Sequence, residues 1–226
     1  KLGSTDLSFV QALPNHTLTS LTWVGRSKYT DLPNILKHQG KSLQSLEFRC
    51  QELECPRFLP TFDYRILPTH THNLRHLSAN VHRNGTWPLD VLEHIAAIPT
   101  LRSADLWMGI QSECRKQYED YTNSQRVMER EFGKDYCKGE DQFQKPLLDD
   151  TSALKLFKYM RERKIGAGLD EVTIWVGDWT RAWDGPLYFP AWAEGIRAKV
   201  VCKAEADVNM KDWCVVEEGK EYWKDE

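Results

Sequence analysis

The chain has 226 residues, of which 41% are hydrophobic, and its 30 basic and 33 acidic residues leave a formal net charge of −3. A hydrophobic fraction of this size can form a real core, which excludes wholesale disorder. The near balance of charge gives no electrostatic reason to expect nucleic acid or an anionic membrane as a partner.

The ends and the apolar runs give no sign of membrane insertion or export. No apolar run approaches the roughly 20 residues of a membrane span. The opening segment, KLGSTDLSFVQAL, is mixed and polar, unlike a secretory signal peptide. Because the chain starts at Lys1 without an initiator Met, we expect it to be a piece of a longer protein.

A short apolar pattern recurs along the chain: Leu, two residues, an apolar residue (usually Leu), one residue, then a further apolar residue. It occurs as LTSLTW (18–23), LQSLEF (43–48), LRHLSA (74–79), LRSADL (101–106) and LDEVTI (169–174). The last two apolar positions lie two residues apart, as on one face of a strand, and the residues between them are mostly polar. Each copy therefore predicts a strand with one buried face and one polar face.

Helical patterns lie between the predicted strands. The segment 31–40 has Asp31 as a possible N-cap and Gly40 as a stop. Segments 88–98 and 152–166 place apolar residues at helical spacing, with Leu89, Leu92, Ile95 and Ile98 in the first and Leu154, Phe157 and Met160 in the second. The opening residues 6–14 resemble the end of a helix, and residues 198–206 resemble a last strand.

A strand and a helix repeated at intervals of 25, 31 and 27 residues predict an α/β fold of the leucine-rich-repeat solenoid type. In such a fold a curved parallel sheet lies inside and the helices lie outside. We expect one domain over 1–226, with an insertion at 113–150 and a Trp-rich C-terminal cap at 175–226. Trp175, Trp179, Trp183 and Trp192 could cover the open end of the stack. The alternative is an ordinary doubly wound α/β domain whose strands share a pattern.

The tandem strands, their irregular spacing and the closing Trp-rich segment resemble the leucine-rich-repeat portion of fungal F-box-type proteins. The Asn or Cys usual just past the strand appears here only as Cys50 and Asn80. The resemblance implies a substrate-recognition part of a ubiquitin ligase adaptor, with a protein substrate on the concave face. The ligase would be bound through an F-box upstream of this chain.

If the concave face binds a protein, the exposed strand positions set specificity. The candidate partner-binding residues are Thr22, Glu47, Arg49, His76, Asn80, Asp105, Trp107, Thr173 and Trp175. Trp107 and Trp175 matter most, because exposed aromatic side chains are frequent interface anchors. The alternative is that both pack against the insertion or the cap.

Enzyme signatures are missing from the sequence: G-x-S-x-G, H-E-x-x-H and a phosphate-binding loop do not occur. We therefore expect no catalytic residues, no cofactor and no enzyme activity. The competing hypothesis is an α/β enzyme with scattered site residues and the segment 113–146 as a lid.

The six cysteines are spread thinly, which favours reduced thiols in a cytoplasmic or nuclear protein. Cys50, Cys55, His70 and His72 could form a zinc site, but their spacing does not fit a structural one, and we expect no metal. Two N-x-T sequons, at Asn15 and Asn84, would matter only in a secreted protein.

Overall fold

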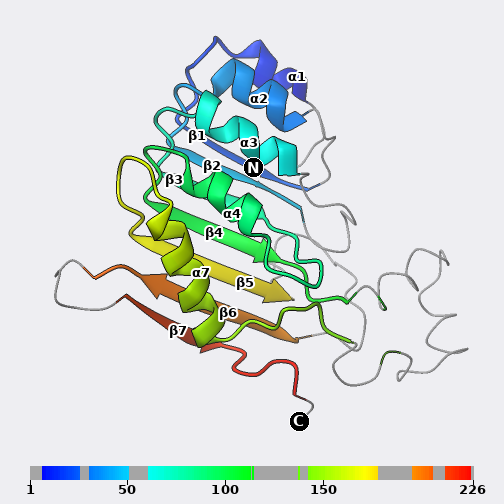
Figure 1. Ribbon diagram of the computed structural model, residues 1–226. Helices are drawn as coiled ribbons and strands as arrows, with labels where there is room; N and C mark the ends of the chain where they lie inside the picture. The colour runs from blue at the N-terminus through cyan, green and yellow to red at the C-terminus, as the bar shows by residue number, and fades with distance from the viewer. Residues whose placement is uncertain are drawn as a thin grey trace, which may run out of the picture.

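The computed structural model describes residues 7–25, 31–50, 61–112, 114, 137, 142–177, 195–205 and 212–224, apart from the side chains of 61–63. These residues form an α/β fold around a seven-stranded, mostly parallel sheet (Figure 1). The strands lie side by side in chain order, from β1 to β7. No described helix is long and apolar enough to cross a membrane.

The first five strands are parallel, and the last two are antiparallel to their neighbours. Their bounds are β1 (Ser20–Val24), β2 (Ser45–Arg49), β3 (His76–Asn80), β4 (Ser103–Met108), β5 (Glu171–Gly177), β6 (Arg197–Lys203) and β7 (Trp213–Glu218).

The described helices lie on one face of the sheet (Figure 1). Their bounds are α1 (Leu7–Ala12), α2 (Asp31–Gln39), α3 (Thr61–His70), α4 (Leu89–Ala96) and α7 (Asp150–Glu162). Each helix from α1 to α4 packs against its neighbour along the chain, and α7 packs against α4, β6 and β7.

The five copies of the repeated pattern occupy equivalent places in the sheet. Their central apolar residues pair in one line across β1 to β5, and all are buried: Leu21, Leu46, Leu77, Ala104 and Val172. The first leucine of the pattern is at most 1% exposed in the second to fifth copies. The predicted parallel strands are therefore confirmed, including the copy that follows the 68-residue interval.

The copies also share a hydrogen bond that joins each to the next. The carbonyl just before β1, at Thr19, accepts from the backbone N–H groups of Gln44 and Ser45 at 2.7 and 3.1 Å. The carbonyls of Gln44, Arg75 and Arg102 each accept two N–H groups from the following copy in the same way. Each strand is thus fixed in register at the point where it begins.

The predicted helices are confirmed in place but not in every detail. In α4, Leu92, Ile95 and the following Ile98 are fully buried, whereas Leu89 is 40% exposed and Val91 takes a place in the core. The apolar stripe was therefore predicted wrongly at Leu89, the first residue of the helix, where Val91 is buried in its place. Helix α7 ends at Glu162, before the predicted limit of 166.

Two elements were not predicted. Helix α3 contains Pro68 within its last turn, and β7 alternates exposed and half-buried residues with no buried one. The last sheet position is therefore taken by β7, which pairs with β6. Of the predicted Trp cap, Trp175 lies on β5, while Trp179, Trp183 and Trp192 lie outside the described residues.

The prediction of reduced thiols is wrong for the described cysteines, all of which are in disulfides. Cys202 of β6 is bonded to Cys214, which faces it directly on β7. Cys114 is bonded to Cys137, and Cys50 is also disulfide-bonded. The thin spacing of cysteines along the sequence did not reveal this, because the pairing of β6 with β7 brings Cys202 and Cys214 together.

The predicted insertion, 113–150, lies mostly outside the described residues, but its two ends are described. Gln111 and Phe143 form an antiparallel bridge, and Ser112 N donates to Gln142 O at 3.1 Å. The buried Arg83 donates to the carbonyls of Gly109, before the insertion, and of Pro146, within its last residues. The chain therefore leaves and re-enters the fold at one place.

Candidate functional site

The helix-free face of the sheet is formed by the strand residues that alternate with the buried ones. We call it the open face, and its parallel part consists of Ser20, Thr22, Val24, Ser45, Glu47, Arg49, His76, Ser78, Asn80, Ser103, Asp105, Trp107, Glu171, Thr173 and Trp175. It contains all nine candidate residues predicted from the sequence. None of the described helices lies on this side of the sheet (Figure 1).

The sheet register places the candidates in three adjacent rows. His76 belongs to the first row. The second row contains Thr22, Glu47, Asp105 and Thr173, and the third contains Arg49, Asn80, Trp107 and Trp175. Asn80, Arg49 and Thr173 are at most 7% exposed, so they support the surface more than they offer contacts.

A stack of aromatic and cationic side chains runs across the third row. The rings of Trp107 and Trp175 are parallel within 5°, with centroids 5.0 Å apart. The Arg49 guanidinium lies 4.0 Å from the centre of the Trp107 ring, and Lys199 Nζ lies 4.9 Å from that of Trp175. Cations on both outer ring faces stabilise the stack, since the ring faces carry partial negative charge.

Both tryptophans of the stack are half-buried, and hydrogen bonds fix Trp107. Trp107 Nε1 donates to Ser78 Oγ at 2.9 Å. Arg49 Nε donates to Glu47 Oε1 at 2.7 Å, and Lys199 Nζ forms an ion pair with Glu217 at 2.6 Å. The stack is therefore built in place before any partner arrives, which lowers the entropy cost of using it in binding.

Three polar side chains, Ser103, His76 and Asp105, lie close together beside the stack, on β3 and β4. His76 Nδ1 is 2.9 Å from Ser103 Oγ, and His76 Nε2 is 3.6 Å from Asp105 Oδ2. Burial raises the pKa of Asp105, and the charge of His76 partly offsets this rise. Asp105 is thus an incompletely solvated carboxylate at the centre of the open face.

The chain Ser103–His76–Asp105 superficially resembles a catalytic triad. Nucleophilic catalysis on a carbonyl also needs N–H donors aimed at the developing oxyanion. Here Ser103 and His76 begin central strands, and the Ser103 backbone N–H already donates to Arg75 O. The arrangement suits polar recognition better than acyl transfer.

Asn80 connects two repeats at the edge of the open face. Its Nδ2 donates to Cys50 O at 2.9 Å, and its Oδ1 accepts from Cys50 N at 2.6 Å. Tyr64 of α3 donates its hydroxyl to the carbonyl of Asn80. Asn80, predicted as a contact residue, is a buried bracket between the ends of β2 and β3.

The antiparallel strands extend the open face with residues that sequence reasoning missed. Lys199, Val201 and Lys203 of β6 pair with Trp175, Thr173 and Glu171. Trp213 and Val215 of β7 follow them, at 40% and 41% exposed. The alternation in WCVVEE was the available sign of β7, but two valines side by side concealed it.

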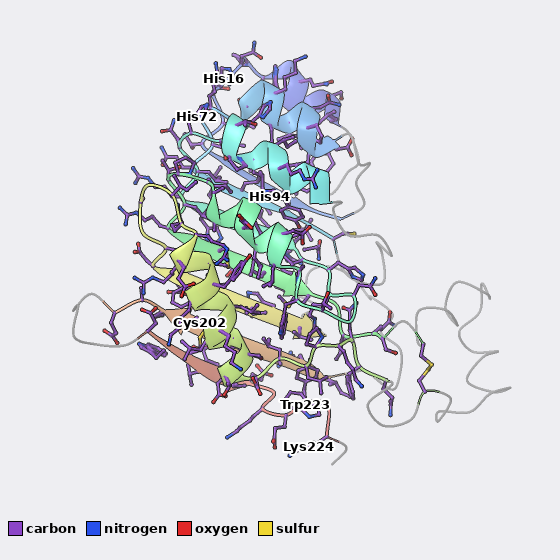
Figure 2. The ribbon with its side chains drawn as sticks, viewed as in Figure 1. His16, His72, His94, Cys202, Trp223 and Lys224 are labelled. Carbon is purple, nitrogen blue, oxygen red and sulfur yellow. A yellow bond between two sulfur atoms is a disulfide. The ribbon has the colours of Figure 1, made fainter. Side chains whose placement is uncertain are left out.

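Metal-ligating side chains do not gather among the described residues. His16, His72 and His94 belong to different segments: the turn after α1, the connection after α3 and helix α4 (Figure 2). Cys50 is bound in a disulfide, so its sulfur is not a thiolate ligand. The zinc site considered from the sequence, with Cys50, Cys55, His70 and His72, therefore lacks one of its four ligands.

The comparisons with known proteins give no relative for this chain. No protein family, no curated protein and no solved structure matches it.

Proposed function

We propose that this chain is a protein-binding module, built as a leucine-rich-repeat solenoid, and that the open face holds the partner. The observation that carries the proposal is a sheet with one face covered by helices and the other bearing the stack of Arg49, Trp107, Trp175 and Lys199. Half-buried, prearranged tryptophans are a common centre of protein interfaces.

The repeated hydrogen bond between copies supports the solenoid. In repeat proteins each unit contacts its neighbours and contributes one strand to a shared inner sheet. The spacing of 25, 31 and 27 residues lies within or just beyond the usual leucine-rich range of about 20 to 29. The bracket between Asn80 and Cys50 supplies the polar link past the strand that such repeats use.

Charge on the open face favours a protein over a nucleic acid. Glu47, Asp105 and Glu171 lie along the central strands, and each would repel a phosphate backbone. Arg49, Lys199 and Lys203 are already paired with carboxylates of this chain. A protein segment with an apolar side chain for the two Trp edges and donors for Asp105 fits these groups.

The test begins with capture of partners by the full-length protein from its own cells, followed by binding measurements with the purified partner. Replacing Trp107 and Trp175 with Ala should weaken binding by about 2 kcal/mol or more, roughly thirtyfold in Kd. Trp107→Phe preserves much of the stack and should lose less.

The matched control changes the opposite side of the molecule. Lys155 and Lys158 are exposed on α7, and replacing both with Ala should leave binding unchanged. Thermal unfolding of every variant separates lost contacts from lost structure. Equal affinity of the Trp variant and the wild type would overturn the open face as the binding surface.

The resemblance to fungal F-box-type proteins suggests a narrower role, as the substrate-recognition part of a ubiquitin ligase adaptor in the cytoplasm or nucleus. Its support is the repeat pattern and the Trp-rich segment alone. The disulfides weigh against it, because cytosolic thiols are kept reduced. Co-purification of a cullin–RING subunit with the full-length protein would support this role.

The alternative of an α/β enzyme has one observation in its favour, the chain Ser103–His76–Asp105. A serine-directed phosphonate probe tests it directly. Labelling of Ser103 that is lost in His76→Ala would establish a nucleophile on the open face, whereas an unlabelled Ser103 removes the support for this alternative.

A further inference from the structure

The disulfides restrict where this protein can mature. All described cysteines are bonded: Cys202 with Cys214, Cys114 with Cys137, and Cys50. The bond between β6 and β7 joins residues that face each other in the sheet register, and Cys202 is fully buried. Such a bond is part of the folded core and is not an exposed, readily exchanged pair.

Disulfides persist in oxidising compartments and are rare in the cytosol and nucleus. Each one forms when two thiols give up two electrons and two protons, which a disulfide carrier of the compartment accepts as it becomes a dithiol. Several bonds in one domain therefore favour the secretory route over the reducing compartments.

Two sequons become relevant in that setting, and they are the only Asn-x-Ser/Thr sequences in the chain. Asn15, His16 and Thr17 lie in the turn between α1 and β1, and all three are exposed. The turn is closed by Thr17 Oγ1, which donates to Pro14 O at 2.9 Å. Figure 2 labels His16 at the outer edge of the molecule.

The second sequon lies in the connection between β3 and α4. Asn84, Gly85 and Thr86 are all exposed, and Gly85 adopts a φ of 72°, as in a tight turn. Neither Asn15 nor Asn84 is needed for a hydrogen bond of its side chain within the described structure. Both amides thus project from exposed turns, where an attached oligosaccharide would not disturb the core.

We propose that this chain matures in an oxidising secretory compartment and carries N-linked oligosaccharides on Asn15 and Asn84. In the reaction, the amide nitrogen of each Asn bonds to C1 of the first sugar of a lipid-pyrophosphate-linked oligosaccharide. The C1–oxygen bond breaks, the lipid pyrophosphate leaves with the bonding electrons, and the amide nitrogen loses one proton to a base.

The two sites are compatible with binding at the open face. Asn15 precedes β1 and Asn84 follows β3, so they lie at opposite strand ends and neither belongs to the rows of the open face. The proposal is independent of the identity of the partner, and it places the chain on the opposite side of a membrane from a ubiquitin ligase.

The test uses the full-length protein from its own cells. Treatment with peptide N-glycosidase should increase its gel mobility in an amount that corresponds to two glycans. Asn15→Gln and Asn84→Gln should each remove one glycan and the double variant both. Thr17→Ala and Thr86→Ala should act like the Asn variants, whereas Thr17→Ser and Thr86→Ser preserve the sequons and should retain modification.

Thiol state is measured on the same sample. Alkylation of the denatured, unreduced protein should leave Cys202 and Cys214 unlabelled, and prior reduction should expose both. Unmodified Asn15 and Asn84 in the natural protein, or free thiols at Cys202 and Cys214, would overturn the proposal. Glycosylation at only one of the two turns would overturn it for the other.

Discussion

The position of Asp105 in the sheet shifts the pKa of its carboxyl group. Burial raises its pKa above 3.8, its ordinary value, and the charges of Glu47 and Glu171 add to the effect. The carboxylate therefore costs the folded state free energy once it is ionised. A raised carboxyl pKa contributes stability below the unfolded value, and this contribution is lost as pH rises through the folded value.

We therefore expect Asp105→Asn to be more stable than the wild type at neutral pH, because the amide carries no charge and so avoids the desolvation cost that raises the carboxyl pKa. The gain in free energy of unfolding should shrink as pH falls toward 3.8, where the wild-type carboxyl becomes protonated. Denaturant unfolding of both proteins across this pH range measures the difference.

The control is His76→Gln, which removes the group whose charge partly offsets the raised pKa of Asp105. Its cost in stability should be confined to the pH range in which Asp105 is ionised and should vanish once that carboxyl is protonated. A stability difference between Asp105→Asn and the wild type that stays constant with pH would contradict the account.

At the residue scale, alternation along each strand was enough to predict which side chains share the open face. It predicted Trp107 and Trp175 on one surface, because apolar and other side chains alternate in the sequences of both strands, although the buried Thr173 interrupts the alternation of exposure in β5. It did not predict that Arg49 reaches past Asn80 to the Trp107 ring, since this contact depends on the order of strands and on the side-chain rotamer.

At the element scale, Asn80 shows how neighbouring repeats are held together beyond the sheet. Replacing Asn80 with Ala leaves the N–H and C=O groups of Cys50 without their partners in a buried place. An unsatisfied buried group costs about 1 to 3 kcal/mol, so we expect a loss of about 2 to 4 kcal/mol in unfolding free energy. Chemical denaturation measures it.

The comparison variant is Asn73→Ala. Asn73 Nδ2 donates to Lys41 O at 2.7 Å in an exposed place, where water can replace the lost bond. Its substitution should cost less than about 1 kcal/mol. Similar losses in the two variants would show that burial of the bracket is not what matters.

Elements with strong local patterns were predicted, and those stabilised by tertiary packing were not. Helix α2 has Asp31 in its first turn and ends before Gly40, where a Cβ would approach Leu36 O to 2.4 Å. Helix α3 carries Pro68, which argues against a helix locally, yet Tyr64 and Leu67 are buried against the sheet. Packing overrides the local preference there.

At the scale of the whole molecule, strand order equals chain order, so each described strand pairs only with strands that are next to it in the sequence. For the solenoid proposed above we expect local stability, with ends that open more readily than the middle. The disulfide between Cys202 and Cys214 closes the C-terminal end, where β7 has an exposed edge and no fully buried residue.

We expect the double variant Cys202→Ala and Cys214→Ala to lose about 2 to 3 kcal/mol, as estimated for a loop of this length. Hydrogen exchange should accelerate in β6 and β7 and stay unchanged in β1 to β3. The variant Cys114→Ala with Cys137→Ala should leave exchange in β6 and β7 as it was. Uniformly faster exchange over all strands would show instead that the whole sheet opens as one unit.

The parallel topology followed from the sequence because five copies of one pattern can share a core only when they are stacked in order. The change to antiparallel pairing at β6 did not follow, since β6 and β7 do not repeat the leading leucine. Residues 178–194, between β5 and β6, lie outside the described residues.

The bridge between Gln111 and Phe143 separates the length of the insertion from the geometry of the repeats. Gln111 and Phe143 lie side by side, and Arg83 donates to Gly109 O before this bridge and to Pro146 O after it. The geometry of the sheet therefore does not depend on the number of residues between 111 and 143. The fourth junction keeps the same hydrogen bonds as the others although Leu101 and Leu169 are 68 residues apart in the sequence. Residues between Gln111 and Phe143 can therefore be inserted, deleted or exchanged without a change in the sheet.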